Sequence, residues 1–140
     1  MEKAASFFQK RQKQLALAAT LYVVLLLLFH WQLPLTHVWL IAAFFSIIMN
    51  FVYIVEAKAR GEFVSAEAIV ASTLIVFSVL GVFVSPGFVI AAIFGHGIWD
   101  LAKHRGTGVP FFTWYTFGCF TVDTLYSTAL AAYWFKTMSL

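Results

Sequence analysis

Two neighbouring segments of this chain each place three titratable side chains at intervals of four residues. In chain order, the two groups are His96, Asp100 and His104, then Tyr115, Cys119 and Asp123. Residues four apart lie on one face of an α-helix, so each group is predicted to form one polar stripe. Imidazole, carboxylate and thiolate groups transfer protons or bind metal ions. The first and the second polar stripe are therefore the candidates for chemistry.

The composition places these stripes in a membrane protein. Of the 140 residues, 62% are hydrophobic and 11% are charged, and the mean hydropathy is +0.89. A soluble domain of this size needs more charge on its surface, and titratable groups in hydrocarbon usually face a bundle interior. The net charge of +3 is too small to indicate a nucleic-acid partner. The single cysteine, Cys119, excludes an intramolecular disulfide.

The apolar stretches predict an all-α integral membrane protein, one domain over residues 1–140 that forms a bundle of five transmembrane helices. The predicted spans are residues 15–29, 37–55, 66–84, 88–103 and 111–135. A bilayer core of ~30 Å requires about 20 helical residues, so the first and fourth spans are short. Ser85, Pro86 and Gly87 are predicted to form a tight turn between the third and fourth spans, because proline does not continue a helix.

Lysine and arginine are concentrated at one side of the predicted bundle. That side carries Lys3, Lys10, Arg11, Lys13, Lys58, Arg60, Lys103 and Arg105. Only Lys136 falls on the other side. The positive-inside rule then predicts a cytoplasmic N-terminus and an external C-terminus. The first span is followed by no small-residue cleavage site, so we expect it to be a retained helix rather than a cleaved signal.

The two stripes are predicted to meet at defined depths. The fourth and fifth spans form an antiparallel pair joined by a short cytoplasmic loop. At ~1.5 Å per residue, His104 lies near the cytoplasmic surface and Asp100 about one turn deeper. His96 and Asp123 then both lie near the middle of the bilayer, where each would satisfy the other.

The same residues carry a resemblance to known proteins. The pattern H-x-x-W-D-x-x-x-H, then P, then W-Y-x-x-x-C-x-x-x-D comprises His96, Trp99, Asp100, His104, Pro110, Trp114, Tyr115, Cys119 and Asp123. Through this pattern, the last third of the chain resembles an uncharacterised family of small bacterial multi-pass membrane proteins, which is a domain of unknown function. The segment Phe111-Phe112-Thr113 is longer than the single residue of the family pattern. The resemblance implies a multi-pass protein of the bacterial inner (plasma) membrane and implies no activity.

Metal binding is the sharpest chemical interpretation of the stripes. His96, Asp100, His104 and Asp123 are candidate ligands, and such nitrogen and oxygen donors suit zinc, iron or manganese. Cys119 would join as a thiolate. Residues eight apart on a helix are separated by ~12 Å, so the two histidines do not readily share one ion. The alternative interpretation is a hydrogen-bonded His–Asp–Tyr network that fixes the helix register.

Further residues are candidates for binding a small or lipid-like ligand beside the stripes. They are Asn50, Trp99, Trp114, Tyr115 and Cys119. Asn50 lies within the second span and needs a partner, whereas Glu56 and Glu67 are predicted at the headgroup boundary. Haem is not favoured, because no two of the 4 histidines lie convincingly at matched depth on different helices.

The sequence therefore favours a membrane protein that binds a metal ion or a small or lipid-like ligand between the fourth and fifth spans. In an enzyme, Asp100 or His96 would act as general acid/base and Asp123 would orient the imidazole. One alternative is a non-enzymatic accessory or assembly subunit of a larger membrane complex. Another is a proton-linked transporter with His96 and Asp123 as the relay, which five spans permit only in a homo-oligomer.

Overall fold

The prediction of an all-helical chain is confirmed over residues 6–139, the range that the computed structural model describes. The elements are η1 (Gln9–Arg11), α1 (Gln12–Gln32), η2 (Leu35–His37), α2 (Val38–Met49), α3 (Phe51–Arg60), α4 (Val64–Phe83), α5 (Pro86–His104) and α6 (Thr113–Met138). No strand occurs within this range. Lys3, one of the basic residues used to predict the orientation, lies outside it.

Helices α2 and α3 follow each other as one rod, so the described range contains five long helical rods. Only Asn50 separates them. Its side-chain amide donates to the Ser46 carbonyl at 2.6 Å, which is the carbonyl that the backbone N–H of Asn50 would use in an unbroken α-helix. That N–H instead contacts the Ile47 carbonyl at 3.3 Å. The hydrogen-bond partner of the Asn50 side chain is therefore the backbone carbonyl one turn earlier in the same rod, not a residue of the polar stripes.

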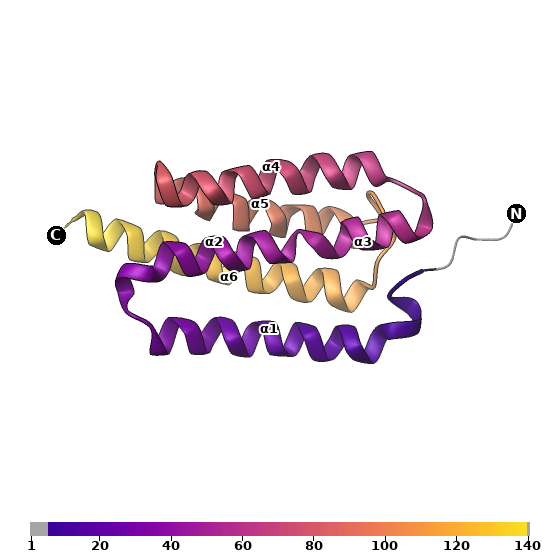
Figure 1. The fold of residues 1–140 in the computed structure, drawn as a ribbon, viewed down its shortest axis with the longest axis horizontal. Helices are drawn as coiled ribbons and strands as arrows, with labels where there is room; N and C mark the ends of the chain where they lie inside the picture. Colours follow the sequence, from indigo (N-terminus) through magenta and orange to yellow (C-terminus); the bar gives the residue numbers. More distant parts are fainter. Residues whose placement is uncertain (1–5, 140) are drawn as a thin grey trace, which may run out of the picture.

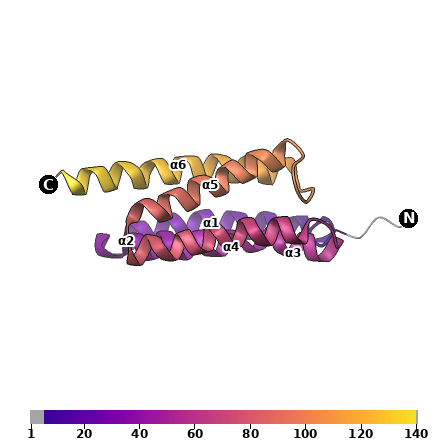
Figure 2. The ribbon, with the colours of Figure 1, turned by 90° about the horizontal axis from the view of Figure 1, so that it is seen from above.

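The rods form two layers. Helices α1, α2–α3 and α4 lie side by side in one layer, α6 lies in the other, and α5 runs obliquely between the layers (Figure 2). The α3–α4 and α5–α6 loops lie at one end of the bundle, and the α1–α2 and α4–α5 connections lie at the other (Figure 1). The C-terminal end of α6 points away from the start of α1.

Three rods in the described range are long and apolar enough to cross a membrane. They are Gln9–Gln32, Leu35–Arg60 and Val64–Phe83. Helices α5 and α6, with 19 and 26 residues, are not among these apolar rods, and they carry the polar stripes. Large apolar side chains are exposed on the outside of the bundle, among them Leu17, Ile69 and Leu125. An apolar exterior of this kind is expected where lipid rather than water surrounds a protein.

Two close approaches fix α5 against its neighbours. Gly81 in α4 faces Val89 in α5, and an added Cβ there would collide with the Val89 backbone. Gly97 faces α6, where an added Cβ would lie 3.1 Å from the Cβ of Asp123. The contact at Gly97 lies beside His96 and brings α6 close to the candidate site.

A buried ion pair fastens the α5–α6 loop to α4. Glu67 pairs with Lys103 and accepts hydrogen bonds from Trp99 Nε1 and from the backbone N–H of Val109, both at 3.0 Å. Glu56 is buried in the same way at the end of α3, where Ser6, the Phe8 N–H and Arg60 donate to it. Both carboxylates therefore lie inside the protein, with their partners supplied by other segments of the chain.

Candidate metal centre

His96, Asp100 and Asp123 meet between α5 and α6. Residues four apart place His96 and Asp100 on one face of α5, and Asp123 projects from α6 toward them. The His96 Nδ1 atom lies 2.9 Å from Asp123 Oδ2 and 3.1 Å from Asp100 Oδ2. The exposed fractions are 3%, 0% and 3% in chain order. The predicted pairing of His96 with Asp123 is therefore confirmed, and Asp100 joins it.

Tyr53 completes the surroundings of this group. It comes from α3, donates a hydrogen bond to Asp100 Oδ1, and stacks on the His96 ring with an interplanar angle of 12° and a centroid distance of 6.0 Å. The sequence did not identify Tyr53, because a tyrosine inside an apolar stretch has the same pattern as a packing aromatic. Its position facing α5 follows only from the way the rods pack.

The group keeps two polar atoms without a hydrogen-bond partner within residues 6–139. They are Asp100 Oδ2 and His96 Nε2. The Nδ1–H of His96 is directed at Asp123 Oδ2, so Asp100 Oδ2, 3.1 Å from the same nitrogen, receives no hydrogen bond from the described residues. A buried carboxylate oxygen without a hydrogen bond is costly, and a cation among the three ligand atoms would remove that cost.

The geometry of the three side chains fits a metal ion. One ligand atom from each lies within 4.8 Å of the others. Metal bonds of about 2.0–2.2 Å to nitrogen and carboxylate oxygen place neighbouring ligands of an octahedron about 3 Å apart. The observed separations of 2.9 and 3.1 Å are compatible with such an edge and equal those of ordinary hydrogen bonds and ion pairs. One imidazole and two carboxylates suit zinc, iron or manganese, and a site with three protein ligands keeps positions open.

His104 and Cys119 lie outside the three-residue group. His104 is exposed, with Nδ1 3.4 Å from Thr116 Oγ1 and its ring against Phe117. The rise of ~12 Å between His96 and His104 separates the two imidazoles, so the candidate ligand set contains three residues rather than four. Cys119 lies one turn from Asp123 on α6 and lines a neighbouring cavity.

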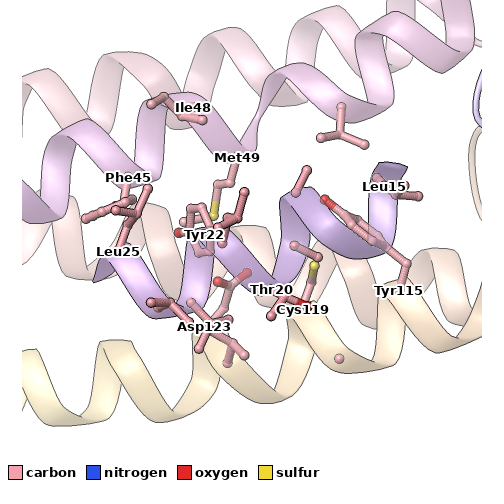
Figure 3. A pocket seen from close by; sticks show the side chains of 18 of the residues that line it. Leu15, Thr20, Tyr22, Leu25, Phe45, Ile48, Met49, Tyr115, Cys119 and Asp123 are labelled. Atoms are coloured by element: carbon pink, nitrogen blue, oxygen red, sulfur yellow. The ribbon is translucent and has the colours of Figure 1, made fainter. Parts of the chain in front are cut away.

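That cavity is a groove of about 900 Å³ between α1, the α2–α3 rod and α6. Apolar side chains of α1 and α2 form most of its walls, and several of them, including Leu21 and Phe44, are exposed at its rim. Its polar lining comes from Tyr22, His96, Tyr115, Cys119 and Asp123. In Figure 3, Cys119 and Asp123 project from α6 toward α1, and Tyr22 lies between Met49 and Asp123. We call this cavity the α1 groove.

Helix α1 is fastened at its two ends, and the α1 groove lies between these attachments. Near its C-terminal end, His30 Nε2 lies 2.5 Å from the Tyr126 hydroxyl of α6. Just before its N-terminal end, the Phe8 N–H donates to Glu56 of α3 at 3.1 Å. Between them Tyr22 packs edge-on against Phe45 of α2. These contacts hold α1 beside the bundle without filling the space toward α6.

The residues predicted to bind a ligand fall into two sets. Trp114, Tyr115 and Cys119 line the α1 groove together with two members of the metal group. Trp99 is instead occupied with Glu67, and Asn50 with the Ser46 carbonyl. Neither residue lines the groove, because Trp99 is directed at α4 and Asn50 at the backbone of its own rod.

No protein-family model, curated protein or solved structure matches the chain. The resemblance to a family of bacterial membrane proteins stays a prediction from the polar stripes. The site is a buried set of nitrogen and oxygen ligands that borders an apolar groove.

Proposed function

We propose that this chain is an integral membrane protein of five transmembrane helices whose buried His96–Asp100–Asp123 site holds a divalent metal ion. The observation that carries the proposal is the convergence of His96 Nδ1, Asp100 Oδ2 and Asp123 Oδ2, with Asp100 Oδ2 receiving no hydrogen bond from residues 6–139. Zinc, iron and manganese are the candidates, because the ligands are one imidazole and two carboxylates. The site serves a small or lipid-like ligand that enters from the α1 groove.

The membrane assignment is supported by the three apolar rods and by the exposed apolar side chains. In such a protein α5 and α6 carry the polar groups inward, which explains their lower hydropathy. By the positive-inside rule, the basic side chains at one end of the bundle support a cytoplasmic location for that end. The bacterial inner membrane is the location that the resemblance implies.

The three ligand residues and Tyr53 have separate roles in this proposal. A bound metal ion supplies Lewis acidity to a ligand oxygen. His96 and Asp123 both line the α1 groove and hold the metal beside it. Tyr53 orients Asp100 through its hydrogen bond to Oδ1 and leaves Oδ2 free for the cation.

Metal content after mild purification tests the proposal. The protein is expected to contain about one zinc, iron or manganese per chain, and Asp100→Asn to lose it, since a neutral amide binds such cations poorly. His104→Gln is the matched control: this histidine belongs to the same stripe but lies outside the group. A folded wild-type protein that takes up none of these metals would contradict the proposal.

A further inference from the structure

A turn before α1 folds back onto the bundle. We call residues 6–11 the N-terminal turn; it ends in η1 and lies at the end of the bundle that carries the α3–α4 and α5–α6 loops (Figure 1). Ser6 is 8% exposed, and its hydroxyl donates a hydrogen bond to Glu56 Oε1 of α3. The Phe8 N–H donates to Glu56 Oε2 at 3.1 Å. The N-terminal turn is therefore attached to α3 through the two oxygens of one carboxylate.

That carboxylate is itself held in place. Glu56 is 1% exposed, and Arg60 Nε, one turn later on α3, lies 2.7 Å from its Oε1 atom. The Gln9 N–H donates to Ser6 Oγ at 3.2 Å, so the Ser6 hydroxyl joins the carboxylate to the backbone of the turn. A buried carboxylate that loses its donors is costly, and this cost keeps the N-terminal turn in its position.

A row of aromatic rings leads from the N-terminal turn to the α1 groove. The Phe8 ring meets Phe111 of the α5–α6 loop edge-on, with ring centroids 5.5 Å apart. Phe111 in turn lies 4.9 Å from the ring of Tyr115, which lines the groove, and 5.1 Å from that of Tyr53, which donates to Asp100. The N-terminal turn is thus connected by packed rings to the groove and to the candidate site.

The contacts of the N-terminal turn lie directly beyond one end of the α1 groove. On α1, the α2–α3 rod and α6, the lining residues nearest this end are Leu15, Val52 and Trp114. Glu56 comes one turn after the last lining residue of its rod, and Phe111 three residues before the first on α6. Phe8 precedes the first lining residue of α1 and contacts both of these partners. The turn therefore bridges all three walls where the groove ends.

We infer that the N-terminal turn is a lid on this end of the α1 groove and that Glu56 is the latch that keeps the lid closed. A molecule dissolved in the water at this end reaches the groove only when Glu56 releases the turn. The long side of the groove, with Leu21 and Phe44 exposed at its rim, faces the hydrocarbon of the membrane instead. This inference goes beyond the proposed function, because it concerns access to the groove and requires no metal.

The single cysteine of the chain provides the test. Cys119 lines the α1 groove, and its labelling by a permanently charged methanethiosulfonate reagent reports entry of water-soluble molecules. The reagent is added to purified full-length protein in nanodiscs, and mass spectrometry follows the rate. Both aqueous faces of a nanodisc are accessible, so the result does not depend on the orientation in a cell. Cys119→Ser gives the background, and denatured protein gives complete labelling.

Two variants weaken different contacts of the lid. Ser6→Ala removes a hydrogen bond to the latch, and Phe8→Ala removes the ring that packs on the α5–α6 loop. Each is expected to label Cys119 about tenfold faster than the wild type. The matched controls are Ser65→Ala, exposed near the start of α4, and Phe83→Ala, 82% exposed at the end of α4. Both controls are expected to be labelled at the wild-type rate.

Low concentrations of urea distinguish an opened lid from an unfolded protein. Local opening exposes little surface, so the rate in Ser6→Ala and Phe8→Ala is expected to stay constant. A rate that rises steeply with urea would show that Cys119 is reached by unfolding and would overturn the inference. Wild-type protein labelled as fast as the two variants would overturn it as well.

Metal content, measured on the same samples, keeps the two proposals apart. Equal labelling of the lid variants and the wild type, in protein that contains metal, would overturn the lid and leave the metal site standing. Faster labelling of the lid variants, in protein that takes up no metal, would overturn the proposed function and leave the lid standing.

Discussion

At the level of single residues, the stability of the His96–Asp100–Asp123 group depends on how the charges of its three side chains balance. Two carboxylates and one imidazole share a space from which water is excluded. Because His96 Nδ1 lies near an oxygen of both Asp100 and Asp123, the three side chains depend on each other energetically. Removing one of them leaves the other two with an altered charge and an incomplete set of hydrogen bonds.

The first prediction concerns the coupling between His96 and Asp123. In chelator-treated protein, His96→Ala and Asp123→Asn are each expected to lower the free energy of unfolding by ~1–3 kcal/mol. The double variant should lose less than the sum, because the first change already removes the interaction. Thermal or denaturant unfolding in detergent measures this. The control pair is Asp123→Asn with His37→Ala, because His37 is an exposed residue of η2. If the losses in the free energy of unfolding are additive in both pairs, the contact between His96 and Asp123 is contradicted.

The second prediction concerns Tyr53, which we place as a positioning residue. Tyr53→Phe removes the hydrogen bond to Asp100 Oδ1 and is expected to weaken metal affinity about 10–100-fold. A competition titration with a chelating dye measures the affinity. Tyr133→Phe is the matched control, because that hydroxyl contacts only the Leu35 carbonyl, at 3.5 Å. Equal affinities in the two variants would show that Tyr53 does not orient the ligand.

At the scale of the elements, the loops decide how the stripes face each other. The loop after α5 is fastened to α4 by the buried pair of Glu67 and Lys103, which the Val109 N–H joins. The other attachment is the close approach of α6 to Gly97, next to His96. Helix α5 is thereby held on both sides, and its polar face is directed to Asp123.

The third prediction tests this fastening. Lys103→Met leaves Glu67 buried without its cation and is expected to cost ~3–5 kcal/mol of stability. Lys58→Met is the matched control, since Lys58 is exposed near the end of α3, and should change stability by less than ~0.5 kcal/mol. Chemical unfolding in detergent measures both. A Lys103→Met protein as stable as the control would show that the pair does not fasten the loop.

The elements also show what sequence periodicity is able to predict. From the spacing of four residues it was possible to predict that His96, Asp100 and Asp123 lie together, because the three residues belong to two consecutive helices joined by a short loop. The spacing could not identify Tyr53 or Tyr22, which reach the site from α3 and α1, since that requires the packing order of the rods. It also did not reveal that Glu56 and Glu67 are buried, because a charged residue near a span end gives no sign of a buried partner such as Lys103.

In the molecule as a whole, the five rods of the described range place the start of α1 and the end of α6 at opposite ends of the bundle. The α3–α4 and α5–α6 loops, with Lys58, Arg60, Lys103 and Arg105 in or beside them, lie at one end. Lys136 lies at the other, near the end of α6. In a membrane this asymmetry would set the orientation.

The fourth prediction follows from that asymmetry. A reporter fused after Leu140 is expected to behave as periplasmic, and one inserted near Gly61 as cytoplasmic. Paired alkaline phosphatase and fluorescent-protein fusions measure the two positions in the same cells. A cytoplasmic reporter after Leu140, or a periplasmic reporter near Gly61, would contradict the five-span orientation.

X-ray absorption at the metal edge of protein loaded with one equivalent of zinc or manganese tests the proposed centre most directly. The metal is expected to have only nitrogen and oxygen ligands at about 2.0–2.2 Å, with a single imidazole contribution that disappears in His96→Gln and persists in His104→Gln. A sulfur ligand from Cys119, two imidazoles, or a spectrum unchanged by His96→Gln would contradict the centre described here.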